Sequence, residues 1–388
     1  MLTDGSFPLG LWWPPPPEET SVAAYRRIAE AGFTFVIGGN GVDTPARNLR
    51  LLAAAEANGL GALVQDARVG AGRAALGAAT AEYARHRSFA GYLLVDEPGA
   101  RGFSHLAEVS RMIEEVAPGR LPYINLFPNY ASPAQLQAPS YRAYLEDFCA
   151  QVRPQVLSFD HYPLLDDGSL DPGYFANWAE IRRAALMVRI PSWVFLQAIG
   201  FLGRRAPTPA EILWQANVAL AFGAKGLMYF TYWTPEGSEQ FTTALIDRSG
   251  RPTTAYDAAV RINRHLAATG ARLLPLCSEG VASTAVSPSA GLDAFHPDGW
   301  ITELAGDPVI LGRFSPGSGP GRERWLLLTN GSPGAPARVD LAVGPRVTEL
   351  GVFDPAAGVL REQRMVRNRP PAVVLEPGAA VLYRLRAG

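Results

Sequence analysis

Residues 91–99 read GYLLVDEPG, an apolar run that ends in two adjacent carboxylates, Asp96 and Glu97, with a proline directly behind them. Residues 92–95 suit a buried strand. An acid after a strand is often only the cap of the next helix. It is also where a (β/α)8 barrel carries its chemistry, because the functional groups of that fold collect at the carboxyl ends of the strands. The rest of the chain decides between these two interpretations.

Apolar, strand-like runs alternate with amphipathic helical stretches between residues 8 and 272. The runs are LGLWW (9–13), FTFVIG (33–38), GALVQD (61–66), GYLLVDE (91–97), PYINLF (122–127), QVLSFDHY (155–162), SWVFLQAIG (192–200) and GLMYFTYW (226–233). Helical periodicity appears in residues 21–32, 47–59, 103–119, 210–226 and 254–270. Several of these stretches end in glycine, as helix C-termini often do. Eight strand–helix units in about 265 residues match the size of a (β/α)8 barrel, or TIM barrel.

A doubly wound parallel sheet is the competing architecture. It usually places a glycine-rich phosphate loop after an early strand. Here the first run is followed by PPPPEE (14–19), and no GxGxxG opens a helix. The glycine-rich stretch VGAGRAALG (69–77) has no Walker lysine, so it favours a helix start over a phosphate site. We therefore predict a (β/α)8 catalytic barrel over residues 1–275.

The pattern of apolar and polar residues changes after about residue 275. Helical periodicity stops, and short β-prone runs such as PVILGRF, RWLLLTN and AVLYRLR are separated by the turn signals NGSPGAP and DPAAG. This pattern predicts a small antiparallel β-sandwich over residues 276–388. Few carboxylates flank its apolar runs, so we expect a packing or accessory role.

Composition excludes several classes of function. The net charge of −1 leaves no electrostatic footprint for nucleic acid or an anionic membrane. The two cysteines and five histidines show no metal-ligand spacing, so we expect neither metal nor cofactor. No apolar run reaches the ~18 residues of a transmembrane helix. The first residues lack the basic-then-apolar pattern of a signal peptide, so a cytoplasmic location is expected unless a signal was trimmed, in which case the protein is secreted. The oligomeric state is not indicated.

The predicted strand ends are rich in aromatic, amide and carboxylate side chains. Aromatic faces stack on sugar rings, and amides and carboxylates bind hydroxyl groups. Glycosidic cleavage needs two carboxylates, one to protonate the leaving oxygen and one to attack or to activate water. We expect Glu97 to be the proton donor and Asp160 or Glu236 its partner. The candidate substrate-binding residues are Trp12, Trp13, Asp96, Asn125, His161, Tyr162, Gln197, Tyr232 and Trp233.

Several of these residues have a plain structural alternative. Trp12 and Trp13 could fill the barrel, and Asp160 could cap a turn before a proline. His161 is more often a satisfied hydrogen-bonding group than a catalyst, and Glu236 lies in a loop where surface acids are common.

With these residues the chain resembles clan A glycoside hydrolases, most closely the β-galactosidase family 42 pattern. In that pattern strand four ends in Asn-Glu, whose Glu is the acid/base; this chain has Asp96 and Glu97. Strand six reads roughly Ser-Trp-Asp-x-Tyr-Pro, and here residues 158–163 read SFDHYP. GAKGLMYFTYW (223–233) and ALIDRSGRPTTAYDAAVRINRHL (244–266) are similar to strand eight and the last helix. The resemblance spans most of the barrel and implies a glycoside substrate.

One position departs from the pattern. The clan A nucleophile is a Glu at the end of strand seven, where this chain has Gln197. An amide is a poor nucleophile, so three hypotheses follow. The enzyme is inverting, with Glu97 and a second carboxylate about 6.5–9.5 Å away. It is a hexosaminidase that uses the substrate's own amide, oriented by Asp96. Or it is a non-catalytic carbohydrate-binding barrel. Because no long inserted loops wall an extended cleft, we expect a glycoside hydrolase that acts at a chain end.

Overall fold

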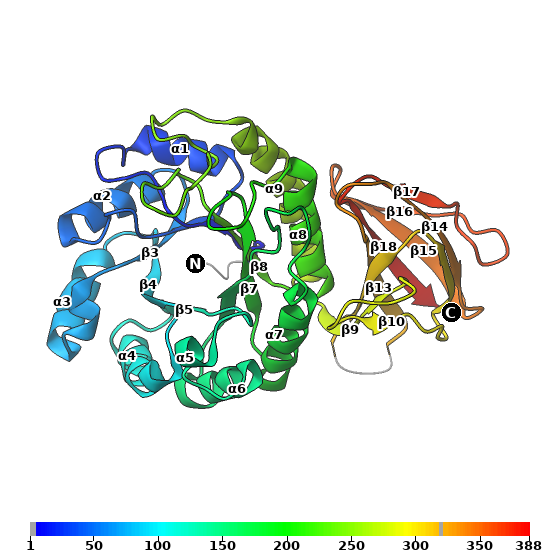
Figure 1. Ribbon diagram of the computed structural model, residues 1–388, viewed down its shortest axis with the longest axis horizontal. Coiled ribbons are helices and arrows are strands. Elements are labelled where there is room, and N and C mark those ends of the chain that lie inside the picture. Colours follow the sequence, from blue (N-terminus) through cyan, green and yellow to red (C-terminus); the bar gives the residue numbers. More distant parts are fainter. Residues whose placement is uncertain (1–4, 318–320) are drawn as a thin grey trace.

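A closed barrel of eight parallel strands forms the first part of the chain in the computed structural model, which describes residues 5–317 and 321–388. The strands are β1 (Leu9–Leu11), β2 (Phe35–Ile37), β3 (Gly61–Val64), β4 (Phe89–Asp96), β5 (Leu121–Leu126), β6 (Leu157–Asp160), β7 (Ser192–Gln197) and β8 (Gly226–Phe230). Each strand pairs with the next, and β8 pairs with β1 to close the ring. The predicted (β/α)8 fold is therefore confirmed, and a strand overlaps each expected run (Figure 1).

Helices surround the barrel (Figure 1). They are α1 (Val22–Glu30), α2 (Pro45–Glu56), α3 (Arg73–Tyr83), α4 (Phe103–Val116), α5 (Pro133–Leu136), α6 (Tyr141–Val152), α7 (Tyr174–Val188), α8 (Pro209–Ala221) and α9 (Thr254–Leu273). The short 3₁₀ helices η1 (Ala67–Gly70) and η2 (Ala100–Gly102) precede α3 and α4. The glycine-rich stretch does begin a helix, because Gly72 supplies the φ of +96° that precedes α3.

Large rings fill the inside of the barrel beneath the strand ends. The rings of Phe35 and Trp193 lie 5.4 Å apart and are almost fully buried. They fit because glycines stand opposite them: a Cβ on Gly10 would lie 2.3 Å from the Phe35 ring, and one on Gly226 would lie 2.6 Å from Trp193. The barrel is thus a packed core with no central pore, and a ligand has room only at its ends.

Two antiparallel sheets follow the barrel. After α9 ends at Leu273, β9 begins at Cys277. The larger sheet has the order β10-β9-β12-β13-β18-β15-β16, and the smaller has the order β11-β14-β17. The strands are β9 (Cys277–Ser283), β10 (Asp293–Ala294), β11 (Ile301–Gly306), β12 (Val309–Ser315), β13 (Glu323–Asn330), β14 (Ala337–Val343), β15 (Val347–Asp354), β16 (Val359–Glu362), β17 (Val373–Leu375) and β18 (Ala380–Ala387). All pairs are antiparallel except β9 with β10.

The larger sheet is buried on both faces. Along β13, Trp325 and Leu327 join the barrel's core cluster, whereas Leu326 and Leu328 join a second core shared with β11 and β14. Successive side chains of a strand point to opposite faces, so a strand buried on both sides reads as a continuous apolar run. This explains the sequence RWLLLTN, which lacks the alternation of a one-sided strand.

Helix α8 is the element that joins the two parts (Figure 1). It packs against β7 on one side and against β12 and β13 on the other, and Trp214 within it is fully buried. The Asn217 side chain donates to the Gly378 carbonyl over 2.9 Å. A helix that is apolar nearly all round is expected only where neighbours cover every side. Among the described residues, no helix combines the length and the apolar character that crossing a bilayer needs.

Candidate active site

A bulge in β4 turns Asp96 into the barrel. Leu93 pairs with Tyr123 of β5 and Asp96 pairs with Asn125, so three residues of β4 span two of β5. Strict alternation from the inward-facing Leu93 would point Asp96 outward. The extra residue instead leaves Leu94 and Val95 on the helix side and returns Asp96 to the inside. Such bulges commonly re-aim a side chain next to a functional site.

The next residue, Glu97, bends the chain sharply. Its φ is +49°, a left-handed conformation that is uncommon for residues other than glycine and costs on the order of 1–3 kcal/mol. Its N–H donates to the Asn125 carbonyl over 2.8 Å, which holds the bend. As a result both Asp96 and Glu97 line one cavity, although consecutive residues of a regular strand would face opposite sides.

Asn125 connects the carboxylates of two strands. Its Nδ2 donates to Asp96 Oδ1 over 3.0 Å and to Asp160 Oδ1 over 2.8 Å. Its Oδ1 accepts from Ser158 Oγ over 3.1 Å, and Ser158 Oγ is 2.7 Å from Tyr123 Oη. This chain fixes the amide orientation, because the Ser158 hydroxyl needs the oxygen and the acids need the nitrogen. Because Asn125 Nδ2 is 3.0 Å from Asp96 Oδ1 and 2.8 Å from Asp160 Oδ1, these two carboxylate oxygens lie at most 5.8 Å apart.

Burial raises the pKa of all three acids, and the charges of neighbouring acids raise the pKa of Glu97 and of Asp160 further. Burial raises the pKa of Asp96 to about 6, opposed by the Asn125 hydrogen bond, even though the side chain faces the open cavity. Burial and the charge of Asp96 raise the pKa of Glu97 to about 7. Burial, followed by the charges of Glu97 and Asp96, raises the pKa of Asp160 well above its usual value. Near neutral pH the cluster therefore holds both protonated and ionised carboxyl groups, as acid–base chemistry requires.

Aromatic side chains wall the cavity above these acids, which has a volume of about 370 Å³. Trp12 and Trp13 lie just beyond the end of β1, and Tyr162 lies beyond the end of β6. These three predicted binding residues thus lie with Asp96, Glu97, Asn125 and Asp160 around one space, as the sequence analysis expected. Backbone bonds from Tyr232 N to the Trp12 carbonyl and from Trp233 N to the Trp13 carbonyl hold the two tryptophans in place.

Several further residues line this cavity that the sequence did not mark as candidates. They are Phe127, Tyr130, Ala131, Gln135, Phe201, Leu202, Arg204 and Phe230. Most belong to loops after β5 and β7, where no apolar run or paired motif marks them. Tyr130 follows the predicted end of strand five by a few residues, which was the one available signal. Arg204 had none, because its place depends on how its loop folds back.

Two predicted binding residues point elsewhere. Gln197 is completely buried, and its amide accepts from Leu164 N over 2.9 Å and donates to the Arg205 carbonyl over 2.7 Å. The loops after β6 and β7 therefore close over it. His161 Nδ1 is 2.9 Å from Asn177 Oδ1, and its ring is buried beside Tyr174. Protein groups thus bind the Gln197 amide and His161 Nδ1, and neither residue is among those that line the cavity.

The three predicted site residues from the strand-eight region do not line the cavity either. Tyr232 is 1% exposed and lies edge-on to Phe33, behind the barrel wall. Trp233 is covered by the turn at Gly250. Glu236 is exposed in the loop beyond and is not among the residues that line the cavity. The described structure thus supports these three residues as packing or surface groups, and Tyr232 and Trp233 act on the cavity only through the backbone bonds to the tryptophans.

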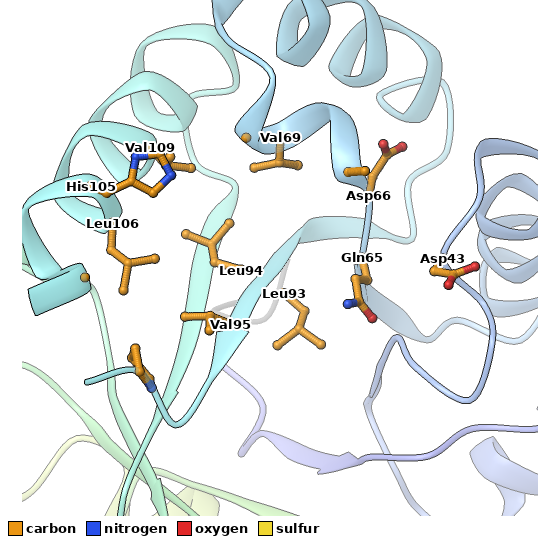
Figure 2. A pocket seen from close by; sticks show the side chains of 14 residues that line it. Asp43, Gln65, Asp66, Val69, Leu93, Leu94, Val95, His105, Leu106 and Val109 are labelled. Carbon is orange, nitrogen blue, oxygen red and sulfur yellow. The ribbon is translucent and has the colours of Figure 1, made fainter. Parts of the chain in front are cut away.

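A larger cavity of about 580 Å³ lies on the other side of β4 (Figure 2). Leu94 and Val95, which the bulge leaves on the helix side, line it together with Leu106 and Val109 of α4. Its buried acid is Asp66. Burial raises the pKa of Asp66, but hydrogen bonds from Arg68 and Tyr83 outweigh this effect and hold that pKa below its usual value. An ion-paired acid with a lowered pKa is poorly suited to proton transfer near neutral pH, so the smaller cavity is the stronger candidate site. Within the described residues, no group of His, Cys, Asp and Glu side chains is arranged to hold a metal ion.

Comparison with known proteins places the fold. No family model matches the sequence, and no curated protein matches it. Among solved structures, the chain is similar to a beta-galactosidase from the psychrophilic Marinomonas ef1, with 13% identity, a TM-score of 0.52 and coverage of 70% of this chain and 62% of that chain. It is similar to an alpha-amylase from Geobacillus thermoleovorans in complex with acarbose, with 13% identity, a TM-score of 0.54 and 98% coverage of both chains. A putative alpha-galactosidase from Bacteroides fragilis gives 11% identity and a TM-score of 0.54 over 99% of this chain and 80% of that one.

Identities this low show the fold alone. The family 42 resemblance, with Gln197 in place of the nucleophile, stays a prediction. The chain has the TIM-barrel fold of distantly similar glycoside hydrolases, followed by a C-terminal β domain.

Proposed function

We propose that this protein is a glycoside hydrolase in which Glu97 is the general acid. The observation that carries the proposal is the position of Glu97: burial and the neighbouring Asp96 raise its pKa to about 7, and it lines an aromatic-walled cavity with two further carboxylates. A general acid is most effective when its pKa lies near the working pH, because it is then protonated and still a ready donor. The tryptophans and Tyr162 supply the faces on which a sugar ring stacks.

Asp96 is the proposed ionised partner. Its pKa of about 6 lies below that of Glu97, so at neutral pH Asp96 loses its proton first. An inverting route would need an ionised Asp160. Burial, followed by the charges of Glu97 and Asp96, raises the pKa of Asp160 and so disfavours that form. A substrate-assisted route needs an ionised Asp96 beside a protonated Glu97. The geometry favours the second route, because Asp96 and Glu97 line one cavity and Asn125 supports the Asp96 carboxylate. In this route Asp96 holds the N–H of a 2-acylamino group, the acyl oxygen attacks the anomeric carbon, and the leaving oxygen takes the Glu97 proton as the glycosidic bond breaks.

The size of the cavity supports action at a chain end. Small-molecule sites commonly measure about 300–1,000 Å³. At about 370 Å³ this cavity lies at the small end of that range. We propose that it holds the terminal sugar while the remainder of the substrate extends toward solvent.

The test is hydrolysis by purified protein of a panel of aryl glycosides and oligosaccharides, with and without a 2-acetamido group. Glu97→Gln should lower kcat on a substrate with a poor leaving group by ~10²–10⁴-fold, because the amide keeps the shape but has no transferable proton. Glu108→Gln, at an exposed position on α4, is the matched control and should leave kcat unchanged.

NMR of the first-formed product separates the mechanisms. Retention of configuration restricted to acetamido sugars is expected for substrate assistance, and inversion would instead assign Asp160 as the base. Sugar binding without turnover on any substrate would show a carbohydrate-binding barrel and overturn the proposed activity.

A further inference from the structure

Arg204 brings a positive charge to the cavity. It is the one cation among the described residues that line this space. Its Nε donates to the Tyr162 carbonyl over 2.9 Å. Neither Nη1 nor Nη2 has a hydrogen-bond acceptor among the described residues, so the guanidinium keeps most of its donors for a ligand.

The protein holds this side chain in a fixed orientation. Arg204 follows a two-residue turn, in which Phe201 and Arg204 exchange both backbone hydrogen bonds at 2.8 Å. The two central residues, Leu202 and Gly203, both have positive φ, as in a tight type I′ hairpin. The guanidinium carbon lies 4.7 Å from the centre of the Tyr130 ring, which supports it from one side. The rotamer is thus set by the backbone bond below and the ring beside it.

No described acid forms an ion pair with Arg204, although its charge, after the hydrogen bond from His161, helps to lower the pKa of Asp171. Asp171 Oδ1 accepts from Gly173 N over 2.8 Å and lies 3.4 Å from His161 Nε2, and no ion pair with Arg204 forms within 4.0 Å among the described residues. Asp96 and Asp160 share Asn125. A half-buried arginine with free donors at the wall of a small cavity is built to bind an anion, because the planar guanidinium matches a carboxylate with two parallel hydrogen bonds.

We propose that the sugar bound in this cavity carries a carboxylate, as in a uronic acid, and that Arg204 is the residue that recognises it. This inference rests on the proposed function, since it assigns the substrate class of the same site. Arg204 comes from the loop after β7 and Glu97 from the end of β4, so in this proposal Arg204 holds a ring substituent while Glu97 acts at the anomeric carbon. The aromatic wall accepts the ring face, and Arg204 selects an acidic ring over a neutral one.

The test measures binding in the Glu97→Gln variant, so that turnover is not needed. Glucuronate, galacturonate and mannuronate, each also as its 2-acetamido-2-deoxy form, are compared with the corresponding neutral sugar by calorimetry. At least one acid should bind ten-fold or more tightly than its parent. Arg204→Gln should weaken binding of that acid by at least ten-fold and leave the affinity for the neutral sugar within two-fold. Arg204→Lys should recover only part of the loss, because a point charge replaces the bidentate fork.

Arg101→Gln is the matched control, since it removes an exposed positive charge that does not line the cavity. It should leave both affinities unchanged. Equal binding of acids and neutral sugars, or an equal loss of both in Arg204→Gln with an unchanged melting temperature, would overturn the inference. Failure of hydrolysis with selective, Arg204-dependent acid binding would sink the proposed activity alone, so the two results are distinguishable.

Discussion

At the scale of single residues, Asn125 organises the candidate site. It is 1% exposed and its amide has no freedom to turn, because Ser158 occupies its oxygen and two carboxylates occupy its nitrogen. A neutral donor shared by Asp96 and Asp160 stabilises their ionised forms without a full positive charge. The acids therefore keep raised pKa values, which a buried arginine or lysine in the same place would abolish.

The raised pKa of Glu97 predicts how the activity depends on pH. Activity should fall as pH rises through about 7, because Glu97 then loses the proton it must donate. In Asp96→Asn the charge that raises the pKa of Glu97 is gone, so the pKa of Glu97 should fall while its burial keeps it above 4.5. The shift is measured by ¹³C NMR titration of the Glu97 carboxyl carbon, assigned with Glu97→Gln. An unchanged or higher pKa in Asp96→Asn would contradict the coupling.

Gln197 gives a second prediction at this scale. Its Nε2 donates to the carbonyls of Leu164 and Arg205, so Gln197→Glu would replace a donor by an acceptor in a fully buried place. Each unsatisfied carbonyl costs about 1–3 kcal/mol, and the new acid would have a raised pKa. The variant should unfold at lower denaturant concentration, more so at pH 8 than at pH 5. Gln240→Glu, at an exposed position in the loop after β8, is the control and should match the wild type. A Gln197→Glu variant of full stability and higher kcat would instead reveal a vacant nucleophile position.

At the scale of elements, β4 shows how one residue redirects a site. The pairing shift between Leu93 and Val95 decides whether Asp96 points to the cavity or to α4. The sequence GYLLVDE gives no sign of this shift, because Leu94 and Val95 suit either face equally. Partner strand β5 supplies the register, and that information is not local.

The barrel strands also predict which glycines matter. Gly10→Ala would put a Cβ 2.3 Å from the Phe35 ring, inside a core that cannot expand. Overpacking of this kind typically costs ~1–3 kcal/mol. Gly77→Ala, within α3, meets no atom within 4 Å and should stabilise by ~0.5–1 kcal/mol through helix propensity. Urea unfolding compares the two variants, and similar effects in the same direction would refute the packing argument.

At the scale of the whole molecule, the C-terminal sheets are part of one folded unit with the barrel. The core cluster continues from the barrel helices through α8 into β12 and β13. Separation of the two parts would expose both the apolar face of the sheet and the outer face of α8. The sheets thus cover α8, which on its other side packs against β7.

The free energy of unfolding should depend on pH because the folded state raises the pKa of Glu97. The folded state holds the Glu97 proton up to a pKa of about 7, above the ordinary 4.5, so it binds protons more tightly than the unfolded state between these values. Burying Glu97 therefore destabilises the fold above pH 7, and this cost disappears as pH falls toward 4.5. Glu97→Gln should be more stable than the wild type at pH 8, by up to about 3 kcal/mol, and no more stable at pH 4.5. Denaturant unfolding at both pH values measures the difference, and an equal gain at both would rule out titration as its cause.

The sequence by itself determined the alternation of elements, the change to β structure after residue 275 and the acid pair at the end of strand four. These are local patterns, since side-chain period and turn chemistry are written in consecutive residues. It also predicted Trp12, Trp13, Tyr162, Asn125 and Asp160 around the same cavity, because the ends of parallel barrel strands must converge.

Only the tertiary structure decided which way individual strand-end side chains face and which loops return to the cavity. Gln197 and His161 lie at strand ends, yet neighbouring backbone and side-chain groups occupy them. Arg204 lies far from any strand-end motif, yet a two-residue turn brings it to the cavity wall. The pKa values of Asp96 and Glu97 likewise depend on burial and, for Asp96, on a hydrogen bond from Asn125 of another strand. Register, loop closure and desolvation arise from contacts between distant parts of the chain, and no local pattern encodes them.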